Sequence, residues 1–182
     1  MTGGMQGTAA YARPDKESVV GAWLLTAADN PDESGLEWQG EGRMTQLRCG
    51  VLFAAISVPG KLVRATAEAW KPEQVDAFLA EALHGGPVIY HRTDHYYVLT
   101  PPSVAGRWQT PPNAYARYGG RRLSCLGDDR YLGVPALGES DPCTAFITYW
   151  SVPVAAPGRL CDPITVLRVF NVGDYLCGEA SA

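Results

Sequence analysis

From residue 87 onward the chain is dominated by short segments of β-forming residues that follow one another. These segments span residues 87–91, 95–100, 121–127, 130–137 and 143–154. The patterns typical of helices fall mainly before residue 86, so helices and strands are segregated along the chain. This order predicts an α+β fold with a mostly antiparallel sheet and flanking helices, rather than a doubly wound parallel sheet. Short turn sequences, Arg-Thr-Asp and Asp-Asp, predict a hairpin within each of two strand pairs.

Apolar residues spaced three and four apart indicate amphipathic helices before the strands begin. The segments with this spacing are residues 16–29, 61–70 and 71–83. The Asn-Pro sequence after the first segment predicts its end, and no clear period follows it. The apolar run 47–59 ends at Pro-Gly and predicts one buried strand. Residues 162–176 begin with Asp-Pro and predict a terminal helix.

The strand at residues 95–100 is followed by two prolines, which cannot continue a central strand because proline lacks the backbone N–H. Ser103, Arg107 and Trp108 therefore lie just beyond the end of a strand. Three interpretations stay open for this position. It can border an active site, form the edge of a nucleic-acid groove, or serve as a stiff turn.

The length of 182 residues and the 46% hydrophobic content fit one domain, which we place at residues 15–178 after a disordered tail at 1–14. The net charge of −4 excludes the overall basic character of many nucleic-acid-binding proteins. The five cysteines form no Cys-x-x-Cys pair, which favours reduced thiols and a cytoplasmic location. The chain also has no apolar run of the ~20 residues that cross a bilayer, so we expect no membrane association.

The histidines suggest one possible pocket. His91 and His95 flank a predicted hairpin turn that also carries Asp94, and Ser103 follows the next strand. Histidine and aspartate at such a turn can act as a metal-binding or general-base group, which would fit a small-molecule enzyme. The alternative is a polar hairpin tip in solvent.

Arginines and aromatic residues are interleaved after the proline pair and suggest a second possible site. The residues concerned are Arg107, Trp108, Tyr118, Arg121 and Arg122. Arginine contacts phosphate and aromatic rings stack on bases, so this patch predicts nucleic-acid binding. An ordinary charged loop with packed aromatic side chains is the alternative.

Several stretches, in their order along the chain, resemble a family of actinobacterial proteins: the amino-terminal domain of bifunctional DNA primase/polymerases. The stretches are GAWLLTAADNP, LRCGVLFAAISVPGKL, GGPVIYHRTDHYYVLTPPS and LGDDRYLGVPAL followed by YWSVPV. The resemblance covers about residues 18–172. It implies an archaeo-eukaryotic-primase fold, in which helices flank a sheet like that of an RNA-recognition motif.

The chain departs from this family at its catalytic motifs. The family carries an Asp-x-Asp motif on a strand and a Ser-x-His motif, whereas this sequence contains neither and reads Phe53-Ala54-Ala55-Ile56 at the corresponding strand. Two-metal nucleotidyl transfer needs those carboxylates. We therefore expect a catalytically degenerate domain, with no catalytic residue, metal or cofactor, that binds nucleic acid or a nucleotide in a regulatory role. The five Trp and nine Tyr leave a protein-interaction module open as well.

Overall fold

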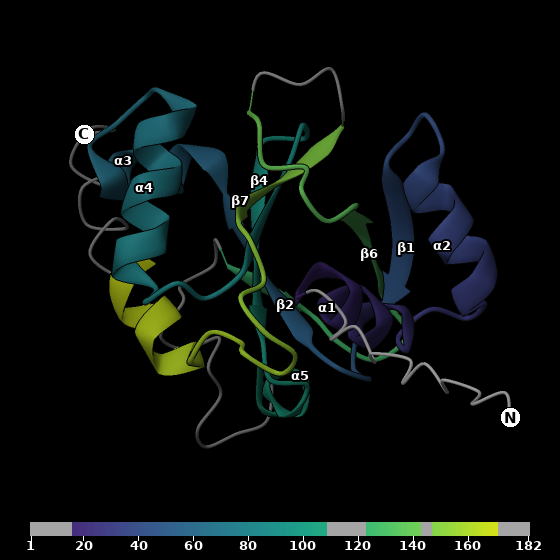
Figure 1. The fold of residues 1–182 in the computed structure, drawn as a ribbon. Helices are drawn as coiled ribbons and strands as arrows, with labels where there is room; N and C mark the ends of the chain where they lie inside the picture. Colours follow the sequence, from purple (N-terminus) through teal and green to yellow (C-terminus); the bar gives the residue numbers. More distant parts are fainter. Residues whose placement is uncertain (1–15, 109–122, 143–146, 171–182) are drawn as a thin grey trace, which may run out of the picture.

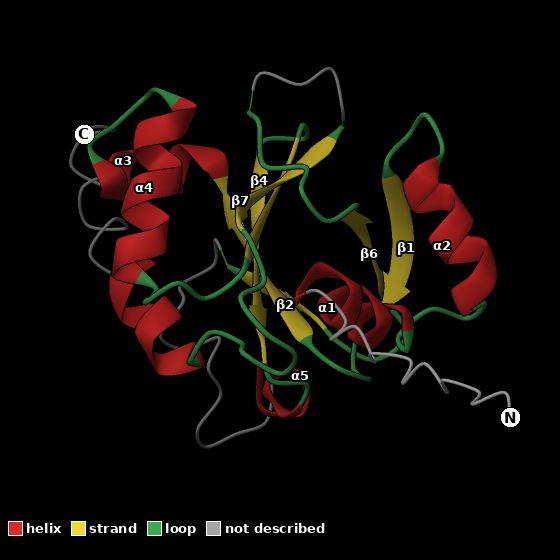
Figure 2. Cartoon of the chain, viewed as in Figure 1, coloured by secondary structure: helices red, strands yellow, loops and turns green. Residues whose placement is uncertain are grey.

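A five-stranded antiparallel sheet forms the centre of the protein, in a computed structural model that describes residues 16–108, 123–142 and 147–170. Its strand order is β5-β2-β4-β3-β7, with every neighbouring pair antiparallel. The strands are β2 (Ala54–Pro59), β3 (Val88–His91), β4 (His95–Thr100), β5 (Ser124–Leu126) and β7 (Thr148–Val152). Helices lie on both sides of this sheet (Figure 1, Figure 2), which confirms the predicted α+β class.

One face of the sheet is covered by two helices and a separate two-stranded ribbon. The elements are α1 (Lys16–Leu25), α2 (Pro31–Gln39), β1 (Met44–Arg48) and β6 (Tyr131–Pro135), and β1 pairs antiparallel with β6. Leu24, Leu47 and Trp150 are among the buried residues of the core between this layer and the sheet. The layer appears on the right in Figure 1.

The other face is covered by helices. These are α3 (Gly60–Ala67), α4 (Pro72–Ala82), the short α5 (Ser103–Trp108) and a helical segment at residues 163–170. Ile56 and Val98 from the sheet pack with Leu79 and Phe170 in a second core. Because side chains alternate between the faces of a strand, β2 contributes to both cores and is buried along nearly its whole length.

The apolar run 47–59 is two strands in different sheets, so the prediction of a single strand was wrong. The chain turns at Gly50, where φ is +88°, and a Cβ there would lie 2.0 Å from the Asp128 carboxylate. Glycine suits this turn because it adopts positive φ without steric strain. The strand before the turn joins the ribbon, and the strand after it joins the central sheet.

The Asp128-Asp129 turn is present, but the strands on either side of it do not form the predicted hairpin. β5 pairs with β2 of the central sheet, whereas β6 pairs with β1 of the ribbon. Asp129 adopts a positive φ in the turn and forms an ion pair of 2.9 Å with Arg48. Non-local pairing therefore overrides the local hairpin signal.

Helix α2 was missed because the Asn-Pro sequence was interpreted only as a stop. Asn30 is the N-cap of α2, with its side chain accepting a hydrogen bond from the Glu33 amide, and Pro31 occupies the first turn. Both residue types are favoured at these positions. One dipeptide thus separates α1 from α2 and starts the second helix.

Some predictions fall outside the described residues. They are the disordered tail at 1–14, Tyr118, Arg121 and Arg122 of the proposed nucleic-acid patch, and residues 171–176 of the terminal helix. Among the described residues, no helix has the length and apolar character needed to cross a bilayer.

Candidate functional site

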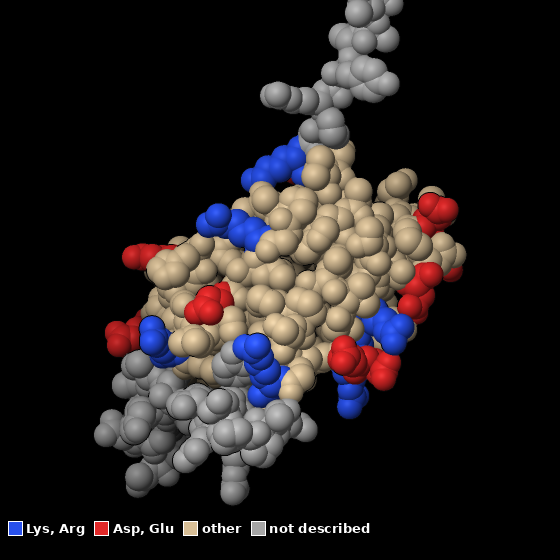
Figure 3. Space-filling model, turned by 90° about the horizontal axis from the view of Figure 1, so that it is seen from below, with Lys and Arg blue, Asp and Glu red and all other residues tan. Residues whose placement is uncertain are grey.

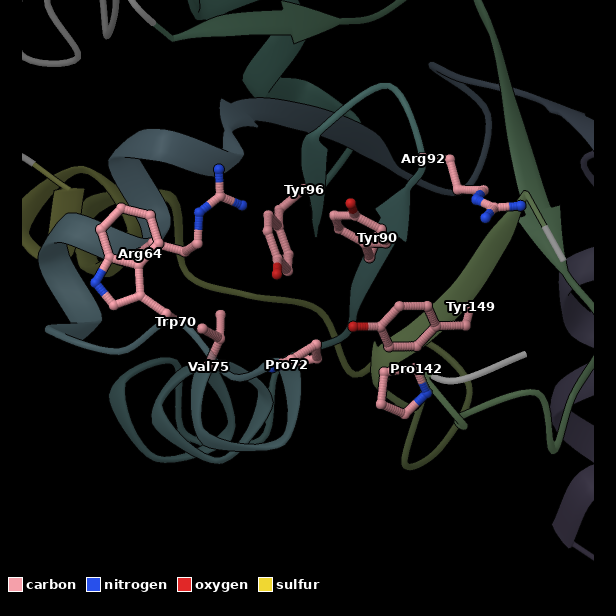
Figure 4. Close-up of a pocket in the computed structure, with 9 residues that line it drawn as sticks. All are labelled: Arg64, Trp70, Pro72, Val75, Tyr90, Arg92, Tyr96, Pro142 and Tyr149. Atoms are coloured by element: carbon pink, nitrogen blue, oxygen red, sulfur yellow. The ribbon is translucent and has the colours of Figure 1, made fainter. Parts of the chain in front are cut away.

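A cavity of about 200 Å³ lies between the helical layer of α3 and α4 and one end of the central sheet. Aromatic rings, two arginines and two prolines make up most of its wall (Figure 4). The lining residues are Arg64, Trp70, Pro72, Val75, Tyr90, Arg92, Tyr96, Pro142 and Tyr149. We call it the tyrosine pocket.

Three tyrosines from three neighbouring strands form the sheet side of the pocket. Tyr90 of β3 lies opposite Tyr96 of β4 and opposite Tyr149 of β7. Residues directly opposite each other in paired strands share a face, so all three rings project toward the helices. The ring centroids of Tyr90 and Tyr96 are 4.9 Å apart, and those of Tyr90 and Tyr149 are 5.3 Å apart. The strand register therefore builds a continuous aromatic wall.

An ion pair between α3 and the β3–β4 turn supports one end of the pocket. Arg64 binds both oxygens of Asp94 in a bidentate arrangement, with N–O distances of 2.7 and 2.8 Å. This hydrogen bonding lowers the pKa of Asp94 below its ordinary value. The turn approaches α3 so closely that a Cβ on Gly60 would lie 2.1 Å from an Asp94 oxygen. The backbone N–H of Gly60 also donates to the Asp94 carbonyl at 2.7 Å.

Two further side chains mark the rim. Trp70, in the connection between α3 and α4, is 78% exposed, and the Arg64 guanidinium lies 5.8 Å from the centre of its ring. Arg92, in the β3–β4 turn, lies at the opposite end of the pocket from Arg64 (Figure 4). The rim thus has an exposed aromatic ring, the Arg64 guanidinium paired with Asp94 at one end, and the Arg92 guanidinium at the other.

A carboxylate on α4 lies at the hydroxyl end of Tyr149. Asp76 accepts hydrogen bonds from the Tyr149 hydroxyl, at 3.2 and 3.3 Å to its two oxygens, and a short one from the Ser151 hydroxyl. Burial raises the pKa of Asp76 to about 6 despite these bonds. The register of β7 shifts by one residue between the partners of Val88 and Ile89, which leaves Ser151 as an extra residue. Such bulges redirect side chains.

The histidine pocket suggested by the sequence does not assemble. His91 and His95 lie directly opposite each other beside Tyr97, on the face of the sheet opposite the tyrosine pocket. The Nδ1 atoms of both rings are within 3.0 Å of Thr93 oxygens. Asp94 binds Arg64 instead, and Ser103 lies beyond the far end of β4, in α5. The described residues contain no cluster of three or more metal-binding side chains.

The described part of the predicted nucleic-acid patch does not form an exposed stacking surface. Arg107 is exposed on α5, but Trp108 is only 5% exposed and packs in the core beneath the sheet. On the face shown in Figure 3, Lys and Arg side chains are separated by uncharged surface and interspersed with acidic ones. Phosphate-backbone binding over many nucleotides needs clustered cations, and the described residues on this face form no such cluster.

The strand segment where the resembled family carries acidic residues is wholly apolar and closed. Phe53, Ala54, Ala55 and Ile56 have no exposed surface and divide between the two cores. No side chain of this segment can reach a ligand in solvent. The tyrosine pocket lies elsewhere, against the β3–β4 hairpin.

Sequence reasoning singled out Asp94, which pairs with the pocket residue Arg64, but it did not predict the tyrosine pocket itself. The hairpin register would have placed Tyr90 opposite Tyr96, because the three-residue turn fixes which residues pair. No local pattern points to Trp70 or Asp76. No protein-family model, curated protein or solved structure matches the chain, so the functional proposal depends on the geometry of this site.

Proposed function

We propose that this protein is a nucleotide-binding domain and that the tyrosine pocket holds the ligand. The observation that carries the proposal is the composition of one cavity wall, which combines three tyrosines and Trp70 with the guanidinium groups of Arg64 and Arg92. Aromatic faces stack on nucleobases, and arginine binds phosphate oxygens with two parallel hydrogen bonds. Few other small-molecule classes need both features in one site.

The size of the pocket favours one base over a longer strand. A dry cavity of about 150 Å³ holds a benzene ring. A cavity of about 200 Å³ therefore has room for one planar base, with the ribose and phosphate at the open rim. The exposed ring of Trp70 offers a stacking face, and the Arg92 guanidinium is the rim group that we assign to phosphate.

The hydroxyls of Tyr96 and Tyr149 can form hydrogen bonds with a ligand as neutral, protonated groups. Burial raises the pKa of Tyr96 and Tyr149 above the ordinary value, and the nearby Asp76 carboxylate raises both further. Both hydroxyls therefore stay protonated and can bond the polar edge of a base.

Binding, rather than nucleotidyl transfer, is the activity proposed. The closed apolar segment Phe53–Ile56 supplies no metal ligand to a two-metal mechanism. The resemblance to the primase/polymerase family is consistent with a nucleotide ligand, and membership of that family is part of this proposal. A regulatory role follows from it, with the bound nucleotide as the signal.

Titration with nucleoside monophosphates tests the proposal. Calorimetry with AMP, GMP, CMP and UMP, at roughly 50 and 300 mM salt, should detect binding that weakens as salt screens the phosphate contact. Trp70→Ala removes a stacking partner worth about 1–3 kcal/mol and should weaken binding at least ~5-fold.

The matched control is Leu36→Ala, which removes another exposed apolar side chain, from α2 on the far layer. This variant should bind as the wild type does. Absence of any binding up to millimolar nucleotide, or equal affinity in Trp70→Ala and wild type, would overturn the proposal. Tighter binding of a single-stranded oligonucleotide than of any mononucleotide would show that the ligand is a nucleic-acid strand instead.

A further inference from the structure

The hydroxyl of Tyr149 lines the tyrosine pocket and forms hydrogen bonds with a carboxylate, which sets the direction of those bonds. Its oxygen lies 3.2 and 3.3 Å from the two oxygens of Asp76. An ionised carboxylate only accepts hydrogen bonds, so the Tyr149 proton is donated to Asp76. The Ser151 hydroxyl also donates to this carboxylate and helps to hold it in place.

The orientation of Tyr149 determines whether its hydroxyl donates or accepts a hydrogen bond with a ligand in the pocket. Figure 4 shows its hydroxyl directed into the space between Tyr96 and Pro72, and Asp76 is not among the residues that line the cavity. A phenol oxygen has one proton and two lone pairs. With the proton committed to Asp76, the oxygen presents only lone pairs to the cavity.

We infer that Tyr149 makes the pocket select bases that carry an amino group at the edge facing β7, adenine and cytosine, over their oxo counterparts hypoxanthine and uracil. This inference rests on the proposed nucleotide-binding function. An amino group donates an N–H to the Tyr149 oxygen. A carbonyl oxygen at the same place would face a lone pair with no proton between the two atoms, and neither acceptor would be satisfied.

The neighbouring groups of the pocket do not reverse this preference for a hydrogen-bond donor on the base. The Tyr96 hydroxyl points into the same space, but it is protonated and serves as donor or acceptor, so it tolerates both kinds of base. The Arg64 guanidinium is occupied by Asp94 at the rim. We therefore assign this selectivity to Tyr149.

The test compares pairs of nucleotides that differ in the amino or oxo group and in the proton on the adjacent ring nitrogen, and share the sugar and phosphate. Calorimetry at about pH 7.5 should give roughly ten-fold tighter binding of AMP than IMP, and of CMP than UMP, the size expected for one unpaired acceptor in a half-open site. Tyr149→Phe should bring both ratios close to one. The control Tyr131→Phe removes another hydroxyl bound to a carboxylate, that of Asp29 at 2.7 Å, and should keep both ratios.

A second measurement uses the wild-type protein and does not depend on how a variant folds. Protonation of Asp76 allows the carboxyl group to donate and frees the Tyr149 proton, so the AMP-to-IMP ratio should fall toward one between about pH 7.5 and 5. The groups that face Asp76 are Glu73 on α4, Tyr149 and Ser151 on β7, and Tyr96 on β4. Both nucleotides share a phosphate, so its titration cancels in the ratio.

The outcomes separate the two proposals. Equal affinity for AMP and IMP at pH 7.5, or a preference for IMP, overturns the selectivity and leaves nucleotide binding intact. A ratio unchanged in Tyr149→Phe and constant with pH also overturns it. Failure of every nucleotide to bind overturns the proposed function, and the selectivity with it.

Discussion

Replacement of Asp76 by Asn should stabilise the protein at alkaline pH and have little effect at acidic pH. Burial raises the pKa of this carboxyl from 3.8 to about 6, so the folded state disfavours its charged form. The folded protein then binds more protons than the unfolded chain between about pH 4 and 6, and the stabilising contribution is lost as pH rises through about 6. Asn keeps an oxygen that accepts from Ser151 or Tyr149 and carries no charge.

The expected change in the free energy of unfolding follows from the pKa shift of Asp76. One pKa unit corresponds to about 1.4 kcal/mol, and solvent screening of this partly buried group reduces the total to ~1–2 kcal/mol. Asp76→Asn should therefore raise the free energy of unfolding by that amount at about pH 8 and by close to zero at about pH 4.

Urea denaturation followed by tryptophan fluorescence measures this difference at each pH. Asp29→Asn is the matched control, because Asp29 is an exposed carboxylate that also accepts a hydrogen bond from a tyrosine. It measures the effect of removing one negative charge from this acidic protein. A destabilisation by Asp76→Asn at pH 8, or a difference from wild type that does not vary with pH, would refute the reasoning.

Two further substitutions test a turn beside the pocket and the start of a helix in the opposite layer. Gly60→Ala places a Cβ 2.1 Å from an Asp94 oxygen and 2.8 Å from an Arg64 nitrogen. Urea denaturation should therefore show a loss of ~1–2 kcal/mol in the free energy of unfolding. The control is Gly106→Ala, where the added Cβ has no atom within 4 Å, and it should be neutral or stabilising. Equal effects at the two glycines would contradict this account of the turn. Asn30→Ala removes the N-cap of α2 and should lower the free energy of unfolding by ~0.5–1 kcal/mol; an unchanged urea midpoint would show that the cap contributes nothing.

The predictable parts of the fold are those that local spacing determines. Helices α3 and α4 and the β3–β4 hairpin were predicted from apolar periodicity, Pro72 and a three-residue turn. The pairings of β5 and β6 were not predicted, because each strand finds a partner far away in the sequence. A local turn signal cannot distinguish a hairpin from a crossover between two sheets.

In the candidate site, too, the local contacts could be predicted from the sequence and the long-range contacts could not. Tyr90 and Tyr96 face each other through a local register, but Tyr149 joins them only through the pairing of β3 with β7. Asp76 meets Tyr149 and Ser151 because α4 packs against the bulged strand, a contact across more than seventy residues of sequence. The sequence suggested a histidine site because His91 and His95 are close together along the chain. The pleat of the sheet places both side chains on the opposite face from the tyrosines.

The central claim is that a nucleotide occupies the tyrosine pocket, and the indole N–H signals of the five tryptophans in an NMR titration with AMP test it most directly. We predict a progressive shift of the Trp70 signal. The signals of Trp38 and Trp150, whose indole N–H groups donate to Val134 and Pro135 carbonyls in the opposite core, should stay in place. An unmoved Trp70 signal at millimolar AMP, or shifts confined to Trp38 and Trp150, would contradict the claim.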